Sequence, residues 1–373
     1  MTIATEPTTW MMSQGGPAGR VRASHVPRVE SVGRRLPPAR LTTAELMAST
    51  RHRTKIDLER LTGVRERRIV AGRDDSMSLA VAAAADCLSR SRHGPEEIEA
   101  VVSCSISKYD GGLVQRIEPP MSLAVASAIG AGDAVAFDVA NACAGMLTGV
   151  LLVTDRIRRG EIRCGMVVSG EYISRLGANA AAHVRSIASR ELASLTLGDA
   201  GAAVILDRAP EGGRGVEFVG FTTISRHSRL CLGFPDRHAP GARMFTRARA
   251  LQRAAIADVP VLLREALDAA GLEIGDIDHV IPHQTSVRAI RKGIRGANEA
   301  LGGASRNPVV VTVDRYGNTA STTHFVALAE ELRAGRVRPG DRVALIGLAS
   351  GLEIGIVLFT VDEGLVRNNG DDD

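Results

Sequence analysis

Long apolar runs, aromatic side chains and paired cysteines are all scarce in this 373-residue chain. No apolar run approaches the roughly 20 residues that a membrane-spanning helix requires, so we expect no membrane segment. Aromatic residues make up only 3% of the chain, so the core must be packed from Ala, Val, Leu and Ile. The N-terminal residues include Glu6 and lack the apolar stretch of a secretory signal.

The five cysteines lie far apart in the sequence and include no CxxC pair. This spacing predicts neither a disulfide framework nor a zinc site. We therefore expect a reducing, cytoplasmic setting, with no metal and no redox cofactor. The cysteines are Cys87, Cys104, Cys143, Cys164 and Cys231.

Basic residues slightly outnumber acidic ones, 46 to 42, which gives a net charge of +4. Arginines gather near the N-terminus and again around Arg288 and Arg291, in the segment RAIRKGIRG. This balance favours an acidic partner. Aromatic residues do not interleave with these cations as they do in proteins that stack nucleic-acid bases, so no nucleic-acid partner is predicted.

Helix-like and strand-like stretches alternate along most of the chain, which indicates an α/β fold built in layers. Two similar halves indicate an internal duplication, and terminal segments of polar composition flank them. The predicted parts are a flexible tail (1–25), an N-terminal half (26–210), a C-terminal half (211–363) and an acidic tail (364–373). The main predicted helices are 76–91, 119–130, 250–271 and 323–337, and the main predicted strands are 98–107, 134–140, 164–172, 200–208, 215–224, 279–284 and 309–317, with a closing hairpin at 342–361.

The segment DVANACAGM places Cys143 at the turn between a predicted strand and a predicted helix, among small residues. A helix that starts at Ala144 would direct free N–H groups and the positive end of its dipole at the sulfur. This would stabilise the thiolate, which is the nucleophilic form of cysteine. Taken alone, the same pattern also fits a small core residue at a tight turn.

Two further segments supply partners for such a thiol. PHQTS places His283 just after a predicted strand, and YGNTAS places Asn318 at a glycine turn before a predicted helix. A thiolate needs a group that accepts and returns protons, and an enolate needs hydrogen-bond donors. Either residue taken alone is more often structural, but His283 and Asn318 together can meet both needs.

These three segments, in this order, resemble the Cys-His-Asn motifs of the β-ketoacyl-(acyl carrier protein) synthase III family of the thiolase superfamily. The segments LERLTGVRERRIV and LTLGDAGAAVIL resemble further parts of the family, so the likeness covers about residues 27 to 361. The resemblance implies a thiolase-like five-layered αβαβα fold made of two related halves, and a homodimer.

The resemblance also implies roles for individual residues. Cys143 would take an acyl group from a thioester, and His283 and Asn318 would stabilise the enolate of the second substrate during a Claisen condensation. The oxyanion hole would use the backbone N–H groups of Cys143 and Ser350. The substrates would be acyl-CoA or acyl carrier protein thioesters in specialised polyketide or fatty-acid-type metabolism.

The chain departs from the family where relatives clamp coenzyme A between a tryptophan and an arginine. Here Asp57 and Leu61 occupy those positions, so either an acidic acyl carrier protein delivers the acyl group or coenzyme A binds differently. Arg288 matches a family arginine near the mouth of the pantetheine tunnel, and Arg291 would add to this basic face. A solvent-facing basic helix remains the alternative reading of this segment.

The segment RIEPPMSLA places Glu118 before two prolines, as in relatives that join two acyl chains head to head in olefin and β-lactone biosynthesis. There the glutamate is a base that acts at the α-carbon across the dimer interface. Three other readings stay open: decarboxylative condensation without this base, acyl transfer to a hydroxyl or an amine, and a poorly active subunit of a heterodimer. The GFGPG loop of chalcone-synthase-like enzymes is absent.

Overall fold

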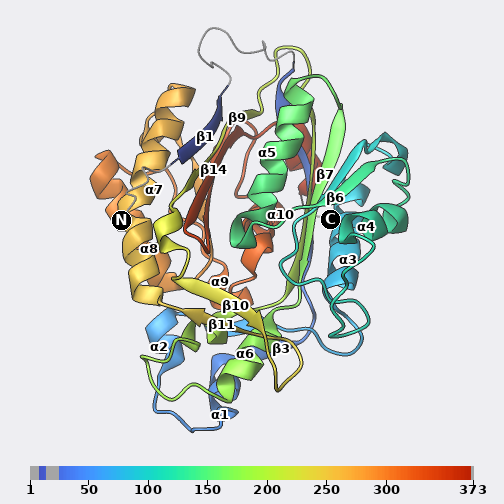
Figure 1. Ribbon diagram of the computed structural model, residues 1–373. Helices are drawn as coiled ribbons and strands as arrows, with labels where there is room; N and C mark the ends of the chain where they lie inside the picture. Colours follow the sequence, from blue (N-terminus) through green and yellow to red (C-terminus); the bar gives the residue numbers. More distant parts are fainter. Residues whose placement is uncertain (1–7, 14–24, 371–373) are drawn as a thin grey trace, which may run out of the picture.

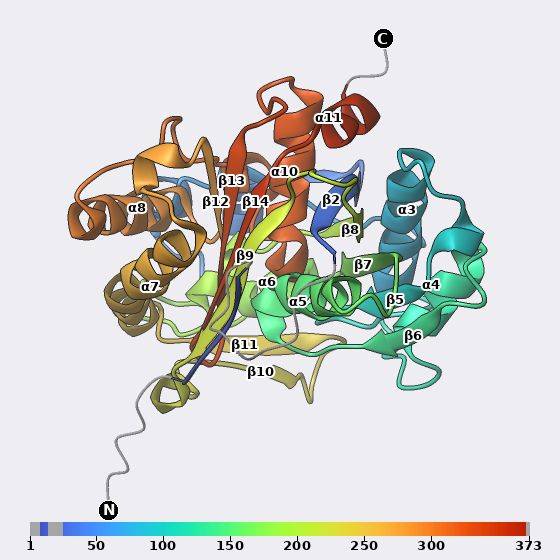
Figure 2. The same cartoon turned by 90° about the horizontal axis from the view of Figure 1, so that it is seen from above.

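The computed structural model describes residues 8–13 and 25–370 and has five layers (Figures 1 and 2). Two five-stranded sheets alternate with three layers of helices. The first sheet contains, in spatial order, β2 (Pro27–Arg35), β8 (Ala200–Arg208), β7 (Cys164–Glu171), β5 (Ala100–Ser103) and β6 (Val135–Asp138). The second contains β1 (Thr8–Ser13), β9 (Val216–Thr223), β14 (Glu353–Thr360), β13 (Arg342–Ala349) and β12 (His279–Pro282).

Helices cover both faces of each sheet, as Figure 2 shows. Because β7 has helices on both sides, all eight of its residues are buried. A strand with only one covered face would instead show buried and exposed residues in alternation. The outer helices of the first sheet are α3 (Ser76–Ser89) and α4 (Met121–Ile129), those of the second are α7 (Ala248–Ala270) and α8 (Val287–Leu301), and the middle layer contains α5 (Gly145–Arg158) and α10 (Thr323–Arg333).

Short elements complete the molecule between the large layers. A pair of strands, β10 (Cys231–Pro235) and β11 (Ala242–Thr246), forms a hairpin of its own. The others are β3 (Arg40–Thr42), β4 (Glu66–Arg68), α1 (Thr43–Ala48), α2 (Leu58–Thr62), α6 (Ser174–Ala181), α9 (Val313–Tyr316) and α11 (Glu363–Asn369). Of the helices in the described ranges, none has the length and apolar character needed to cross a bilayer.

The helix α5 lies against β7 because glycine removes a side chain at the contact. A Cβ atom on Gly149 would lie 2.5 Å from the side chain of Val167, closer than real atoms approach. The N-terminal half of α5 is thereby held against β7, in the middle layer of the molecule. This matters because Cys143 lies just before the start of α5.

The fold confirms the predicted α/β class and the thiolase-like arrangement of two similar sheets, but three local predictions are wrong. Thr8–Ser13, assigned to a flexible tail, is strand β1, which pairs antiparallel with β9; residues 1–7 and 14–24 lie outside the described ones. Residues 364–369, assigned to an acidic tail, belong to α11, in which Leu365 and Asn369 are buried. Residues 309–317 contain the short helix α9 instead of a strand, although Val310 donates a backbone hydrogen bond to Val280 of β12.

Candidate active site

Cys143 lies between β6 and α5, in a single 3-10 turn formed by residues 142–144. The preceding residue, Ala142, has a φ of 42°, a left-handed conformation that non-glycine residues seldom adopt. Such strain persists where the surrounding packing imposes it, and it is frequent at functional sites. The turn leaves Cys143 partly exposed, facing a cavity.

The protonation state of Cys143 differs from the expectation of a helix-stabilised thiolate. Burial raises the pKa of the thiol, and the negative charges of Cys231 and Glu171 add to that effect. The hydrogen bond from its own backbone N–H acts in the opposite direction but is the weaker influence. The resting side chain is therefore a thiol, and a base would have to accept its proton before the sulfur could act as a nucleophile.

His283 follows directly on β12 and is held by its neighbours. Its backbone N–H donates to Ile346 of β13 at 2.8 Å. The next side chain, Gln284, donates to the carbonyl oxygen atoms of Pro282 and Val310 and accepts from the backbone N–H of Thr312 at 2.8 Å. This clamp fixes the end of β12, and with it the position of the imidazole.

The imidazole of His283 is neutral. Burial, together with the nearby His324, lowers the pKa of His283 to about 3. A neutral ring offers one nitrogen that accepts a proton and one that donates, which suits a base for a thiol. Its Nδ1 is buried and has no hydrogen-bond partner among the described residues.

His324, in the first turn of α10, lies behind His283 and carries no motif in the sequence. Its ring lies 5.9 Å from the ring of His283, centroid to centroid, and its Nε2 is 3.0 Å from the carbonyl oxygen of Ile346. Burial lowers its pKa to about 4, so this ring is neutral as well. The same carbonyl oxygen of Ile346 also accepts from the backbone N–H of His283, so one atom holds both histidines in place.

Asn318 lies in the turn before α10, and its backbone pairs with the chain around Leu197. The N–H of Asn318 donates to Thr196 at 2.8 Å, and its carbonyl accepts from Gly198 at 3.0 Å. The side-chain Oδ1 accepts from the backbone N–H of Ala320 at 3.0 Å. The oxygen is therefore occupied by the turn, and the amide N–H₂ is the group left to donate into the cavity.

One cavity of about 1620 Å³ brings Cys143, His283 and Asn318 together, although they are up to 175 residues apart in sequence. Ser350, predicted for the oxyanion hole, lines the same cavity, and so does Arg288. Arg291 and Glu118 do not line it: both side chains are exposed elsewhere on the chain. Its wall is mainly apolar, as an acyl chain requires.

The charges that line this cavity have one sign. Among the described residues, seven cationic side chains and no carboxylate contribute to its wall. Leu61 also lines it, whereas Asp57 instead caps the N-terminus of α2. Sequence reasoning found Arg288 and missed the arginines at the start of α7, which carry no motif. The cations are Arg175, Arg190, Arg247, Arg249, Arg253, Arg288 and Lys292.

Glu171, at the end of β7, is a fully buried carboxyl group behind the site. It accepts hydrogen bonds from the backbone N–H groups of Ile106 and Ser107 and from the hydroxyl of Ser321, which follows Asn318 in the chain. Burial raises the pKa of Glu171, while these donors oppose that effect. Glu171 thus ties the loop after β5 to the turn of Asn318. No sequence motif pointed to it.

The fold defines the class of protein: a thiolase-like α/β protein, with Cys143, His283 and Asn318 around one cavity. The structure is similar to OleA of Xanthomonas campestris with bound lauric acid and lauroyl-CoA, with a TM-score of 0.78 and 23% identity, covering 90% of this chain and 99% of that one. It is similar to 3-oxoacyl-[acyl-carrier-protein] synthase III of Aquifex aeolicus, with a TM-score of 0.75 and 23% identity, covering 90% and 100%.

Sequence comparisons identify the family. Residues 137–225 match the family model of 3-oxoacyl-[acyl-carrier-protein] synthase III, and residues 267–361 match the model of its C-terminal part. The chain is 30% identical to β-ketoacyl-[acyl-carrier-protein] synthase III of Symbiobacterium thermophilum over 343 residues, covering 84% of this chain and 96% of that protein. The chain belongs to the β-ketoacyl-[acyl-carrier-protein] synthase III family, and it is an acyl-thioester condensing enzyme.

Proposed function

We propose that this enzyme loads an acyl group on Cys143 and joins it to a second acyl thioester by a Claisen condensation. The observation that supports this most is the shared cavity, which combines a thiol, a neutral imidazole and a free amide donor. These are the groups that acyl transfer and enolate chemistry need.

The first half-reaction transfers the acyl group to the enzyme. His283 accepts the proton of the Cys143 thiol while the sulfur attacks the thioester carbonyl carbon. The backbone N–H groups of Cys143 and Ser350 stabilise the oxyanion that forms. The carbonyl re-forms, the bond to the carrier sulfur breaks, and the departing thiolate takes the proton from His283.

The second half-reaction forms the carbon–carbon bond. Loss of a proton or of carbon dioxide from the α-carbon of the second thioester gives an enolate, whose oxygen accepts hydrogen bonds from His283 and Asn318. The α-carbon then attacks the acyl carbonyl, the bond to Cys143 breaks, and the thiolate takes up a proton. A β-ketoacyl thioester is released.

A homodimer would complete the site, and the first sheet supports this proposal. Its last strand, β6, has a neighbour on one side only. Apolar side chains next to it are exposed: Ile117 to 83%, Val135 to 66% and Phe137 to 39%. Pairing of β6 with its copy would cover these residues, and it would direct Glu118 toward the cavity of the partner.

A carrier protein or coenzyme A would deliver the substrates. The cations at the start of α7 and on α8 suit the phosphate of a pantetheine arm and the acidic surface of a carrier protein. Charge reversal of Arg249 and Arg288 should slow acylation by carrier-bound thioesters and spare small N-acetylcysteamine thioesters. Equal loss with both donors would contradict this role.

Intact-protein mass spectrometry with a panel of acyl thioesters tests the proposed function. We expect a mass increase of one acyl group in the wild type and none in Cys143→Ala. Glu118→Gln then separates the two condensation chemistries. If it stops the joining of two simple acyl thioesters but not loading, Glu118 is the base; normal turnover of this variant with malonyl-type extenders alone would support the decarboxylative route.

A further inference from the structure

One part of the cavity wall is polar without being part of the catalytic site. Arg175, in the first turn of α6, lines the cavity together with Tyr109 and Tyr172. The two tyrosine rings meet edge to face, with centroids 5.9 Å apart. The group comes from the loop after β5 and from the turn after β7, whereas the cations of the cavity mouth come mainly from α7 and α8.

One polar atom of this group is buried without a partner. The Nε of Arg175 is buried and has no hydrogen-bond partner within the described residues. No described residue pairs with the hydroxyl of Tyr109 or Tyr172. Burial raises the pKa of both tyrosines, so the two hydroxyls stay protonated and can donate. A buried donor left unpaired, such as this Nε, is costly, and a native site normally satisfies it with a ligand or water. The two hydroxyls are not among the buried unpaired atoms and belong to residues that line the cavity.

The carboxylate of Asp199, which lies near this group, already accepts hydrogen bonds from other donors. Asp199 accepts from the backbone N–H groups of Ile173 and Ser174, both at 2.7 Å, and from that of Val70 at 2.7 Å. It therefore caps the start of α6 and forms no ion pair with Arg175 within the described residues.

The group is held close to the acyl-bearing sulfur and is covered by the hairpin of β10 and β11. Ile173 and Leu176, on either side of Arg175, belong to the apolar cluster that packs against Cys143. At the tip of the hairpin, a Cβ atom on Gly241 would lie 3.3 Å from the Cβ of Arg175 and 3.8 Å from the hydroxyl of Tyr109. Asn179 of α6 fastens this tip by donating to the carbonyl oxygens of Pro240 and Ala242.

We propose that Arg175, Tyr109 and Tyr172 bind a carboxylate at the far end of the acyl group, so that the enzyme prefers ω-carboxyacyl thioesters to acyl chains that end in a methyl group. This inference rests on the proposed loading of Cys143. A guanidinium and two hydroxyls form the donor set that a carboxylate accepts best. A methyl-terminated chain would leave all three donors unpaired.

The test compares matched N-acetylcysteamine thioesters, which lack the phosphates that mouth cations would bind. Glutaryl, adipyl and suberyl thioesters are paired with pentanoyl, hexanoyl and octanoyl thioesters, and the rate of acylation of Cys143 is followed by intact mass. We expect the carboxylated member of at least one pair to react about 10- to 100-fold faster, the range for a hydrogen bond to a charged group.

Substitutions locate the source of that preference. Arg175→Gln should abolish it while leaving methyl-terminated thioesters as fast as before, and Tyr109→Phe and Tyr172→Phe should each reduce it. Arg175→Lys, which keeps the charge, should retain part of it. Arg185→Gln, an exposed arginine near the end of α6 that does not line the cavity, is the matched control and should change nothing.

Three outcomes would overturn the inference. The first is equal rates within every pair, and the second is a preference that survives in Arg175→Gln. The third is an Arg175→Gln protein that loses rate with coenzyme A thioesters of both kinds but not with N-acetylcysteamine thioesters, since Arg175 would then bind the carrier phosphate. If no thioester acylates Cys143, the proposed function itself fails, which is a separate result.

Discussion

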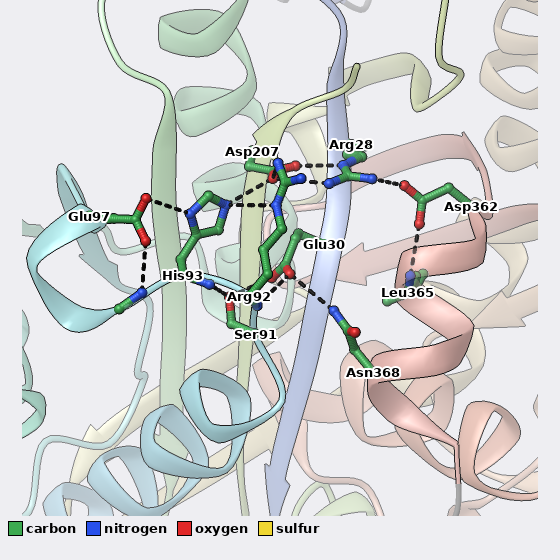
Figure 3. Close-up of polar contacts among 11 residues, drawn as sticks. Arg28, Glu30, Ser91, Arg92, His93, Glu97, Asp207, Asp362, Leu365 and Asn368 are labelled. Atoms are coloured by element: carbon green, nitrogen blue, oxygen red, sulfur yellow. Dashed lines mark hydrogen bonds and ion pairs between the residues drawn. The ribbon is translucent and has the colours of Figure 1, made fainter.

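Two charged regions of this protein are built in opposite ways. Around Asp207, on β8, a buried carboxylate is paired with Arg28, Arg92 and His93 at 2.5–2.9 Å, as Figure 3 shows. Around the cavity lined by Cys143, His283 and Asn318, seven cations contribute to the wall and none forms an ion pair with a described residue. In the first region the charged groups pair with one another within the fold. In the second region the cations have no such partners and are available to a ligand.

The paired region joins parts of the chain that are far apart in sequence. Arg28 of β2 also pairs with Asp362, which caps α11, and Glu30 of β2 accepts from Asn368 in the same helix (Figure 3). Burial tends to raise the pKa of Asp207, but hydrogen bonds from His93 and Arg28 outweigh it and hold that pKa below its usual range. The network therefore ties β2 to β8 and α11. An anionic ligand bound among the unpaired cations of the cavity would add to the stability of the folded protein.

The largest expected effect is in the cavity. Cys143→Ala should abolish acylation and product formation. Among the described residues, the only other cysteine that lines the cavity is Cys231, which begins strand β10 instead of preceding a helix. The melting temperature of the variant should stay near that of the wild type. Intact mass spectrometry with peptide mapping checks this, and acylation of Cys231 in the variant would contradict the assignment.

Loss of either donor to the enolate should have the next largest effect. His283→Ala and Asn318→Ala should lower the condensation rate about 10²–10³-fold, the usual cost of one preorganised donor. Asn318→Ala should still load Cys143. Single-turnover assays with preloaded enzyme measure this step, and a variant within about twofold of the wild type would remove that residue from the mechanism.

The pH dependence sharpens the role of His283. Because burial lowers its pKa to about 3, the ring is neutral throughout the range in which the protein is folded and active. We expect no inflection near pH 6.5, the ordinary histidine value, in the rate of condensation by preloaded enzyme. An inflection there that disappears in His283→Ala would show that the ring titrates in the working range.

Around Asp207, a substitution should lower the free energy of unfolding and leave catalysis unchanged. Asp207→Asn removes one of the two carboxylates that pair with the buried Arg28, which should cost about 3 kcal/mol of unfolding free energy, the lower end of the range for a broken buried ion pair. Acylation of Cys143 under conditions where the variant is folded should be unchanged. Urea unfolding measures the first quantity. Asp155→Asn, which breaks a mostly exposed pair with Arg159, is the control and should cost less than about 1 kcal/mol.

The smallest expected effect is that of His93→Gln. The hydrogen bond to Asp207 raises the pKa of His93, so its contribution is complete below the unfolded value of about 6.5 and is lost as the pH rises through the folded value. We expect the variant to be about 1 kcal/mol less stable at pH 6, with a smaller difference at pH 9. Unfolding curves at both pH values measure this, and a difference that grows with pH would contradict the assigned pairing.

The sequence by itself determined the α/β class and the three chemical groups of the site. Local signals were sufficient for this: the helix predicted at 119–130 is α4, which ends at Gly130 in a left-handed conformation, and Cys143, His283 and Asn318 each lie at a turn between regular elements. Turn chemistry and periodicity act over a few residues, so one sequence reveals them.

Only the tertiary structure decided the states and surroundings of those groups. Burial, rather than the helix end, sets the protonation of Cys143, and contacts between distant segments bring His324 beside His283 and Glu171 beside the turn of Asn318. The pairing of β1 with β9 and the unpaired donors of Arg175 likewise depend on which segments meet. Desolvation and long-range contacts depend on everything packed around a residue, and no local stretch of sequence encodes them.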